Sequence, residues 1–146
     1  MGATGQGRAP RVVDPEPDAR SVTHLDTSFL IGAMTPNSPE DRRVRRWLVE
    51  GEPIGISAVS WAEFLCGPVE ADDVELAPRI VGEPLALLGD DAGLTARLFN
   101  LGGRRRGSLI DCMIAATAIR AGAALATRNA ADFRRFERAG LTIADD

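Results

Sequence analysis

Short apolar segments alternate with helix-length segments along the chain from residue 21 onward. The apolar segments lie at 22–25, 53–59, 84–88, 123–126 and 141–143, and they lack the period-two pattern of half-exposed strands. Strands that are apolar on both faces are typical of a parallel sheet covered by helices on both sides. The sequence therefore predicts one α/β domain over residues 21–146, an α/β/α sandwich around a central parallel sheet of four to five strands.

Residues 1–20 differ in composition from the rest of the chain. They are rich in Gly, Pro and charged residues and show no hydrophobic periodicity, so we expect a disordered N-terminal arm. They also lack the apolar segment of a secretory signal, and no apolar run approaches the roughly 18 residues that a membrane span needs. We therefore expect a cytoplasmic protein that is not associated with a membrane.

Helix signals divide the predicted domain. Thr27 and Ser28 offer N-caps for a first helix, and Ser38, Pro39 and Gly51 delimit a second one. A third helix is predicted to open at 60–63 and to end at 67–68, and 72–80 is predicted as a helix or turn. Further helices are expected at 90–101, from 108 to about 122, and through 133–136.

Several classes of protein are disfavoured by the composition and by the motifs that are absent. The formal net charge of −4 argues against binding of nucleic acid through overall positive charge. The chain has two cysteines and one histidine, which makes a disulfide framework or a zinc site improbable. No phosphate-binding loop, GxGxxG sequence or nucleophile elbow is present, which disfavours nucleoside triphosphatases, dehydrogenases and serine hydrolases.

Four acidic residues are predicted to meet at one edge of the sheet. Asp26 ends the first strand, and Glu63 and Asp132 follow the second and fourth predicted strands. Asp111 lies in the first turns of a helix, 108–119, that is apolar nearly all round and should be buried. Functional groups of parallel α/β sheets gather at the carboxyl ends of the strands, so we expect these carboxylates to lie close together.

Helix capping offers a structural explanation for each acid taken alone. Three of them lie three residues after a capping residue, in the pairs Ser60 with Glu63, Ser108 with Asp111, and Asn129 with Asp132. Asp26 could be an N-cap or a turn residue between strand and helix. Taken singly, each acid could therefore have a purely structural role.

Taken together, the acids point to a metal site. Carboxylates that lie close together without cationic partners repel one another, and their pKa values rise unless a positive charge lies among them. Carboxylate oxygens without a His or Cys cluster suit Mg²⁺ or Mn²⁺ rather than zinc. A metal held in this way can activate water for phosphodiester cleavage.

Four segments resemble the PIN-domain nucleases, and within them the VapC-type toxins of bacterial toxin–antitoxin pairs. The segments are LDTSFLI at 25–31, SAVSWAEFLCG at 57–67, IDCMIAATAIRAG at 110–122 and LATRNAADF at 125–133. The resemblance covers about residues 22–143. It implies a PIN domain over the predicted domain, Mg²⁺- or Mn²⁺-dependent ribonuclease activity on RNA, inhibition by a cognate VapB-like antitoxin, and a homodimer.

The resemblance also assigns roles to individual residues. Asp26, Glu63 and Asp111 match the three acidic positions that line the metal site and carry catalysis in this family. Where relatives often have a fourth acid this chain has Asn129, so the fourth ligand is either Asn129 or Asp132. The resemblance also covers two hydroxyl residues near the acids, Thr27 and Thr127. They either hold a carboxylate or a water in place or cap helices.

Two further features have alternative interpretations. The run of Arg104, Arg105 and Arg106 before the Asp111 helix either grips RNA phosphates or is simply solvated. The arginine group at 42–46 is a partner surface or a solvated face. The alternative to a nuclease is a catalytically inactive PIN-like domain that binds RNA or a partner. A receiver-type or phosphatase domain would need paired acids and a lysine, and the chain contains no lysine.

Overall fold

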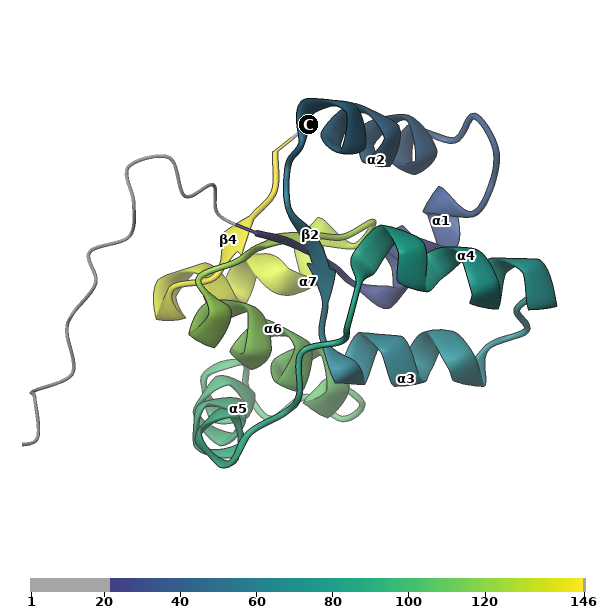
Figure 1. Cartoon of the computed structure of the whole chain (residues 1–146). Coiled ribbons are helices and arrows are strands. Elements are labelled where there is room, and N and C mark those ends of the chain that lie inside the picture. The colour runs from purple at the N-terminus through teal and green to yellow at the C-terminus, as the bar shows by residue number, and fades with distance from the viewer. Residues whose placement is uncertain (1–21, 146) are drawn as a thin grey trace, which may run out of the picture.

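Four short parallel strands form the central sheet of the computed structural model, which describes residues 22–145 (Figure 1). They are β1 (Thr23–Leu25), β2 (Ile54–Ile56), β3 (Ala124–Ala126) and β4 (Thr142–Ile143), in the order β2-β1-β3-β4. The register aligns Leu25 with Ile56 on one side and with Ala126 on the other. The arm predicted for residues 1–20 lies outside the described residues.

Helices cover both faces of this sheet, as the apolar strands require. Leu25, Ile56 and Ala126 point to one face, where they pack in one core with α1 (Thr27–Ala33), α2 (Pro39–Glu50), α3 (Ala58–Cys66) and α4 (Ala71–Val81). Leu125 points to the other face and packs with α5 (Gly89–Leu101), α6 (Leu109–Ala121), α7 (Ala130–Phe133) and the 3₁₀ helix η1 (Arg134–Ala139). The predicted α/β/α arrangement with a parallel sheet is confirmed.

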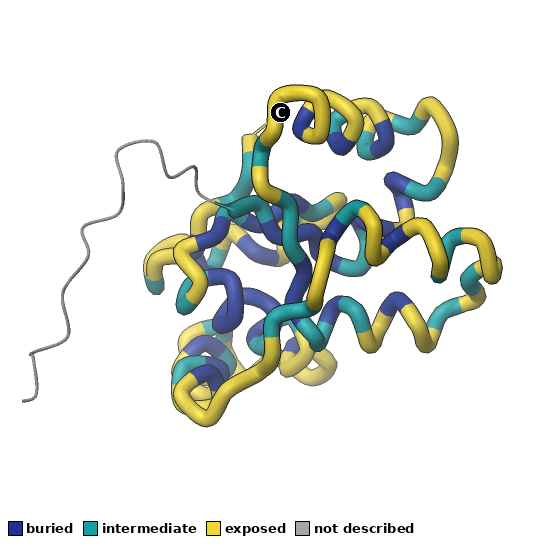
Figure 2. The backbone as a smooth tube through the Cα atoms, viewed as in Figure 1, coloured by how far each residue is buried: buried dark blue, intermediate teal, exposed yellow. Residues whose placement is uncertain are grey.

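Burial differs strongly among the helices. Helix α6 is buried along most of its length between the sheet and α5, whereas α2 and α5 expose one side (Figure 2). This placement explains why the sequence of α6 is apolar nearly all round. None of the helices in residues 22–145 combines the length and apolar character needed to cross a membrane.

The segment 84–88 is not the strand that its sequence predicts. Leu85 forms a single parallel bridge with Ser57. The N–H of Leu85 donates to the carbonyl of Ile56 at 2.9 Å, and the carbonyl of Leu85 accepts from the N–H of Ala58 at 2.7 Å. Pro84 has no N–H to extend this ladder. The sheet therefore has four strands within the described residues.

Two helices begin earlier than predicted. The N-cap of α1 is Asp26 rather than Thr27 or Ser28, and the N-cap of α3 is Ser57, one turn before Ser60. In contrast, α2 begins and ends as predicted, with Pro39 in its first turn and Gly51 in the left-handed conformation after it. The segment predicted as a helix or turn at 72–80 is the regular helix α4.

The strand order places the ends of β1 and β3 side by side. From β1 the chain runs to β2 on one side of the sheet, and from β3 it runs to β4 on the other side. The crevice between two strands whose connections diverge in this way is where open parallel sheets bind ligands. The loops that follow Leu25 and Ala126 form this crevice.

His24 on β1 provides a test of the buried sheet. Its side chain is buried, and burial together with the positive charge of Arg120 holds its pKa below the usual 6.5. The unfolded chain therefore binds a proton at pH values where the folded protein keeps the imidazole neutral. We predict that this residue lowers the free energy of unfolding as the pH falls below about 6.5, by at most about 1.4 kcal/mol per pH unit.

Urea denaturation of the wild type and of His24→Gln between about pH 5 and pH 7.5 measures this contribution. Acidic residues titrate in both proteins, so the difference between the two free energies isolates His24. The stability of the wild type relative to the variant should fall toward low pH, and a difference that does not change with pH would contradict the assignment.

Candidate active site

Asp26 is a buried carboxylate at the carboxyl end of β1. Its Oδ1 accepts hydrogen bonds from the N–H of Phe29 at 2.8 Å and from the hydroxyl of Ser28 at 2.7 Å, so it caps α1. Only 4% of the residue is exposed. Burial raises the pKa of Asp26, hydrogen bonds from Thr127, Phe29 and Ser28 oppose this rise, and the charge of Glu63 adds to it.

Hydroxyl groups connect the acidic residues to the loops that carry them. Thr27 donates to Glu63 Oε1 at 2.7 Å and lies 3.2 Å from the carbonyl of Ser60, which joins α1 to α3. Thr127 bonds to Asp26 and also accepts from the N–H of Asn129 at 3.0 Å. The structure thus places both predicted threonines in contact with a site carboxylate.

Asp111 lies in the first turn of α6 and is half-buried. Burial raises its pKa, Glu63 raises it further, the charge of Arg135 lowers it, and Asp132 and Asp26 raise it again. Electrostatic effects of this kind act over short distances, so Glu63, Asp132 and Asp26 each lie near enough to Asp111 to affect its pKa. Asp111 is therefore placed within electrostatic range of the other three acids.

Helix capping explains only one of these four acids. Glu63 does not belong to a capping box, because Ser57 caps α3 and bonds to the N–H of Ser60. The hydroxyl of Ser108 donates instead to the carbonyl of Arg105, at 2.7 Å. Neither Ser108 nor Asn129 makes a side-chain cap bond to the helix that follows it in the described chain. The capping explanation is correct for Asp26 and wrong for the other three.

The two candidates for the fourth position are placed differently. Asp132 lines a small cavity together with Asp111 and raises the pKa of that residue. Asn129 is exposed at the start of α7, and its backbone N–H donates to the hydroxyl of Thr127. The structure therefore brings the Asp132 side chain toward the acidic group and uses Asn129 to position Thr127.

The predicted arginine run divides between two places. Arg105 and Arg106 line the cavity beside Asp111. Arg104 turns back to α5, where it donates to Asn100 Oδ1 at 2.6 Å and stacks over the ring of Phe99. Sequence reasoning missed Arg135, which lines the same cavity from η1. Its nearness depends on how η1 packs, and only its place three residues after Asp132 could have suggested it.

The donor set suits a hard cation, although the side chains do not form a ready-made cage. Within residues 22–145, no three His, Cys, Asp or Glu side chains stand close enough together to hold a metal ion. Mg²⁺ keeps several of its waters and usually takes only one or two protein carboxylates. Burial is the largest cause of the raised pKa values of Asp26 and Asp111, and the charge of Glu63 raises both further, so a divalent cation would oppose both effects.

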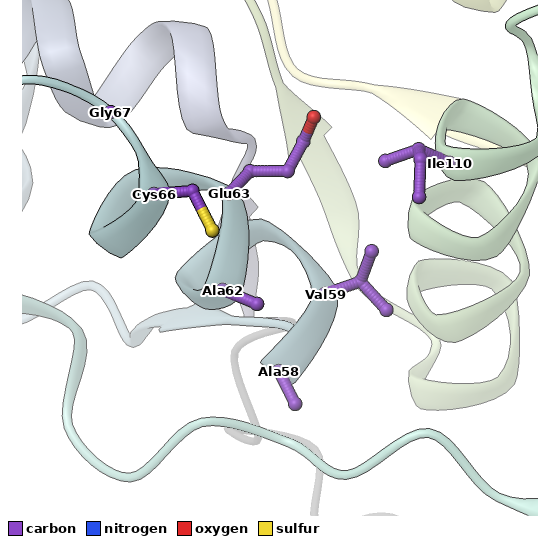
Figure 3. Close-up of a pocket in the computed structure, with 7 residues that line it drawn as sticks. All are labelled: Ala58, Val59, Ala62, Glu63, Cys66, Gly67 and Ile110. Atoms are coloured by element: carbon purple, nitrogen blue, oxygen red, sulfur yellow. The ribbon is translucent and has the colours of Figure 1, made fainter.

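A larger apolar cavity borders the acidic residues. It has a volume of about 610 Å³ and lies between α3 and the first turn of α6. Figure 3 shows the carboxylate of Glu63 pointing from α3 into the space in front of Ile110, with Val59 below it. Glu63 is the charged residue among the side chains that line this cavity, so an apolar binding space adjoins the acidic group.

The fold and the site together define an α/β protein with an acidic cluster at the switch point of a parallel sheet. The family model described as PIN domain matches residues 24–139, a range that holds all four acids. The chain belongs to the PIN domain family, a nuclease family.

Solved structures with the same fold come from bacterial complexes. A chain of VapBC2 from Rickettsia felis, bound to a DNA fragment from the promoter, matches with a TM-score of 0.66 and 19% identity, covering 84% of this chain and 97% of that one. DNA-bound VapBC from Salmonella typhimurium matches with a TM-score of 0.64 and 22% identity, covering 86% and 98%. A toxin-antitoxin complex from Klebsiella pneumoniae matches with a TM-score of 0.58 and 25% identity, covering 77% and 90%.

Proposed function

We propose that this protein is a Mg²⁺- or Mn²⁺-dependent ribonuclease that acts as the toxin of a toxin–antitoxin pair. The observation that carries the proposal is the convergence of Asp26, Glu63 and Asp111 beside the ends of β1 and β3, two of them with raised pKa values. Three mutually repelling carboxylates, which capping does not account for as a group, fit a cation better than a purely structural role.

In the proposed reaction, Asp26, Glu63 and Asp111 would hold the cation, directly or through its bound waters, and Asp132 would assist from beside Asp111. A cation held there would supply an activated water and would stabilise the charge that develops on the phosphodiester. The protein contributes orientation. Thr27 fixes the carboxylate of Glu63, and Thr127 with Ser28 fixes that of Asp26, as outer hydrogen-bond partners do around metal sites.

The proposed partner is a VapB-like antitoxin, and the proposed location is the cytoplasm. The fold neighbours from Rickettsia felis, Salmonella typhimurium and Klebsiella pneumoniae were all solved as VapBC or toxin-antitoxin complexes. A cavity of about 230 Å³, lined by Ile31 of α1, by Met34 at the end of that helix and by Phe64 of α3, offers an apolar seat for a partner segment. The homodimer implied by the family resemblance is retained as part of this proposal.

A catalytically inactive PIN-like binding domain is the competing proposal. It would be favoured by the loss of one of the acidic positions, but all three acids are present in the sequence. Binding of RNA or of a metal does not separate the two proposals, because an inactive domain could still bind both. Cleavage does separate them.

We predict that the purified protein cuts RNA in Mg²⁺ or Mn²⁺, stops in excess chelator, and resumes when Mg²⁺ is restored above the chelator. The reason is that the carboxylates alone provide no nucleophile for a phosphodiester. Gel analysis of an end-labelled RNA measures this, with a DNA of the same sequence as the comparison substrate. Cleavage that continues in chelator would overturn metal dependence, and absence of cleavage with either metal would favour the inactive domain.

A further inference from the structure

Asp111 borders a small polar cavity whose arginine residues have no role in the chemistry proposed above. The cavity has a volume of about 120 Å³ and is lined by two carboxylates, Asp111 and Asp132, and by three guanidinium groups, those of Arg105, Arg106 and Arg135. Pockets that enclose a drug-sized ligand measure roughly 300–1,000 Å³. The space therefore suits a group of a few heavy atoms, such as a phosphate, rather than a whole nucleoside.

Arg135 is held in place by packing rather than by polar partners. Its guanidinium carbon lies 4.5 Å from the ring centroid of Phe136. A side chain at Gly102 would place its Cβ 3.4 Å from both Cδ and Nε of Arg135, so the arginine lies directly against the backbone that ends α5. The Nε atom is buried and has no hydrogen-bond partner in the described structure. A buried donor without a partner is costly, and its cost falls when the rest of the guanidinium group gains strong partners in the cavity.

The position of Arg135 is not explained by an ion pair with Asp111. In the described part of the chain, no ion pair within 4.0 Å joins the two residues. The cavity contains three positive side chains against two negative ones. Its positive excess increases when a divalent cation takes up the charge of the carboxylates. An anion is therefore the ligand that completes the cavity.

We propose that this cavity binds a backbone phosphate of the RNA strand, next to the phosphodiester that is cut, with Arg135 as its fixed anchor and Arg105 and Arg106 as flanking contacts. Guanidinium groups bind phosphate oxygens through two parallel hydrogen bonds, which fixes position as well as charge. The inference rests on the proposed ribonuclease function, because it identifies how the substrate of that site is positioned. Arg135 acts as a positioning residue and Arg104 does not take part.

Binding of a fluorescently labelled single-stranded RNA in chelator, followed by anisotropy at increasing KCl, tests this proposal without cleavage. We expect Arg135→Gln and Arg106→Gln each to weaken binding about 10-fold. Each should also reduce the slope of log K against log salt by about 0.7, the value for one phosphate contact on a single strand. Arg104→Gln is the matched control from the same loop, because Arg104 is engaged by Asn100 and Phe99.

The outcomes separate this proposal from the proposed function. If Arg135→Gln and Arg106→Gln bind RNA as Arg104→Gln does, the subsite is wrong even when the wild type cuts RNA. If the wild type does not cut RNA but the cavity variants lose affinity, the subsite stands without the nuclease. If the variants lose affinity only for RNA that carries a 5′-terminal phosphate, the cavity binds that terminal group, and the proposed contact with a backbone phosphate is wrong. Should Arg135→Gln unfold, the exposed Arg105 and Arg106 decide through their own variants.

In the cleavage assay, the same variants distinguish positioning from catalysis. Arg135→Gln should raise KM with a smaller change in kcat, and Arg135→Lys should recover part of the affinity because it keeps the charge without the planar fork. A large fall in kcat at unchanged KM would overturn the assignment of Arg135 as a positioning residue.

Discussion

Asp111→Asn is expected to lower the rate of RNA cleavage by more than about 100-fold while leaving the metal-free protein as stable as the wild type, or more stable. Changes to the outer partners of metal sites typically cost 10- to 100-fold, so loss of a group that holds the metal should cost more. The stability change has the opposite sign because the pKa of Asp111 is raised by burial and by Glu63. Removing that charge relieves both effects.

The combination of effects makes this a strong test. A substitution that abolishes activity through misfolding lowers both activity and stability, whereas Asp111→Asn should lower only activity. Cleavage kinetics and urea denaturation in chelator measure the two quantities. Asp90→Asn, an exposed acid outside the site, is the control and should leave cleavage unchanged. Wild-type cleavage by Asp111→Asn, or a clear loss of stability in metal-free buffer, would contradict the role proposed for Asp111.

Asp91→Ala is expected to destabilise the fold by about 3–5 kcal/mol, the largest stability effect that we predict. Asp91 is 1% exposed and accepts from the Arg120 guanidinium at 2.7 Å and from the N–H of Leu88 at 2.8 Å. Arg120 also donates to the carbonyl of Ala86 at 2.9 Å. The pair therefore ties α6, which carries Asp111, to α5 and to the segment before it, and removing one partner leaves the other charge unpaired.

Denaturant unfolding of Asp91→Ala beside Asp90→Ala measures this effect. Both residues are acids in the first turn of α5, so loss of a favourable charge at the helix start is common to the two variants. Only Asp91 is buried and paired, and the difference between the variants isolates the ion pair together with the hydrogen bond from Leu88. Equal destabilisation by the two substitutions would show that Asp91 and Arg120 contribute nothing beyond the helix-end effect.

The fold could be predicted from the sequence because each layer of the sandwich has a recognisable hydrophobic pattern. The strands that became β1, β2, β3 and β4 are short apolar runs, and the buried α6 has no polar face. The segment at 84–88 has the same composition but forms one bridge, since whether an apolar run pairs along its length depends on neighbours and on the missing N–H of Pro84. Local composition could not reveal that outcome.

The site was accessible in part for the same reason. Acids that follow parallel strands meet at one edge, so Asp26, Glu63, Asp111 and Asp132 could be placed together from their positions in the sequence. Local sequence could not predict that Arg104 turns away from Arg105 and Arg106 toward α5. That turn depends on the φ of 56° that Arg104 adopts and on its contact with Asn100, which forms only on folding. The approach of Arg135 to Asp111 likewise depends on packing against Gly102 and Phe136.

The most direct test of the central claim is the cleavage of one end-labelled RNA by the wild type and by Asp26→Asn, measured side by side in saturating Mg²⁺ and in chelator. Asn keeps the oxygen that caps α1, so the variant should fold while losing the charge that the cation requires. The account predicts cleavage only by the wild type and only in Mg²⁺. Equal cleavage by the Asp26→Asn variant, or cleavage by the wild type in chelator, would contradict it.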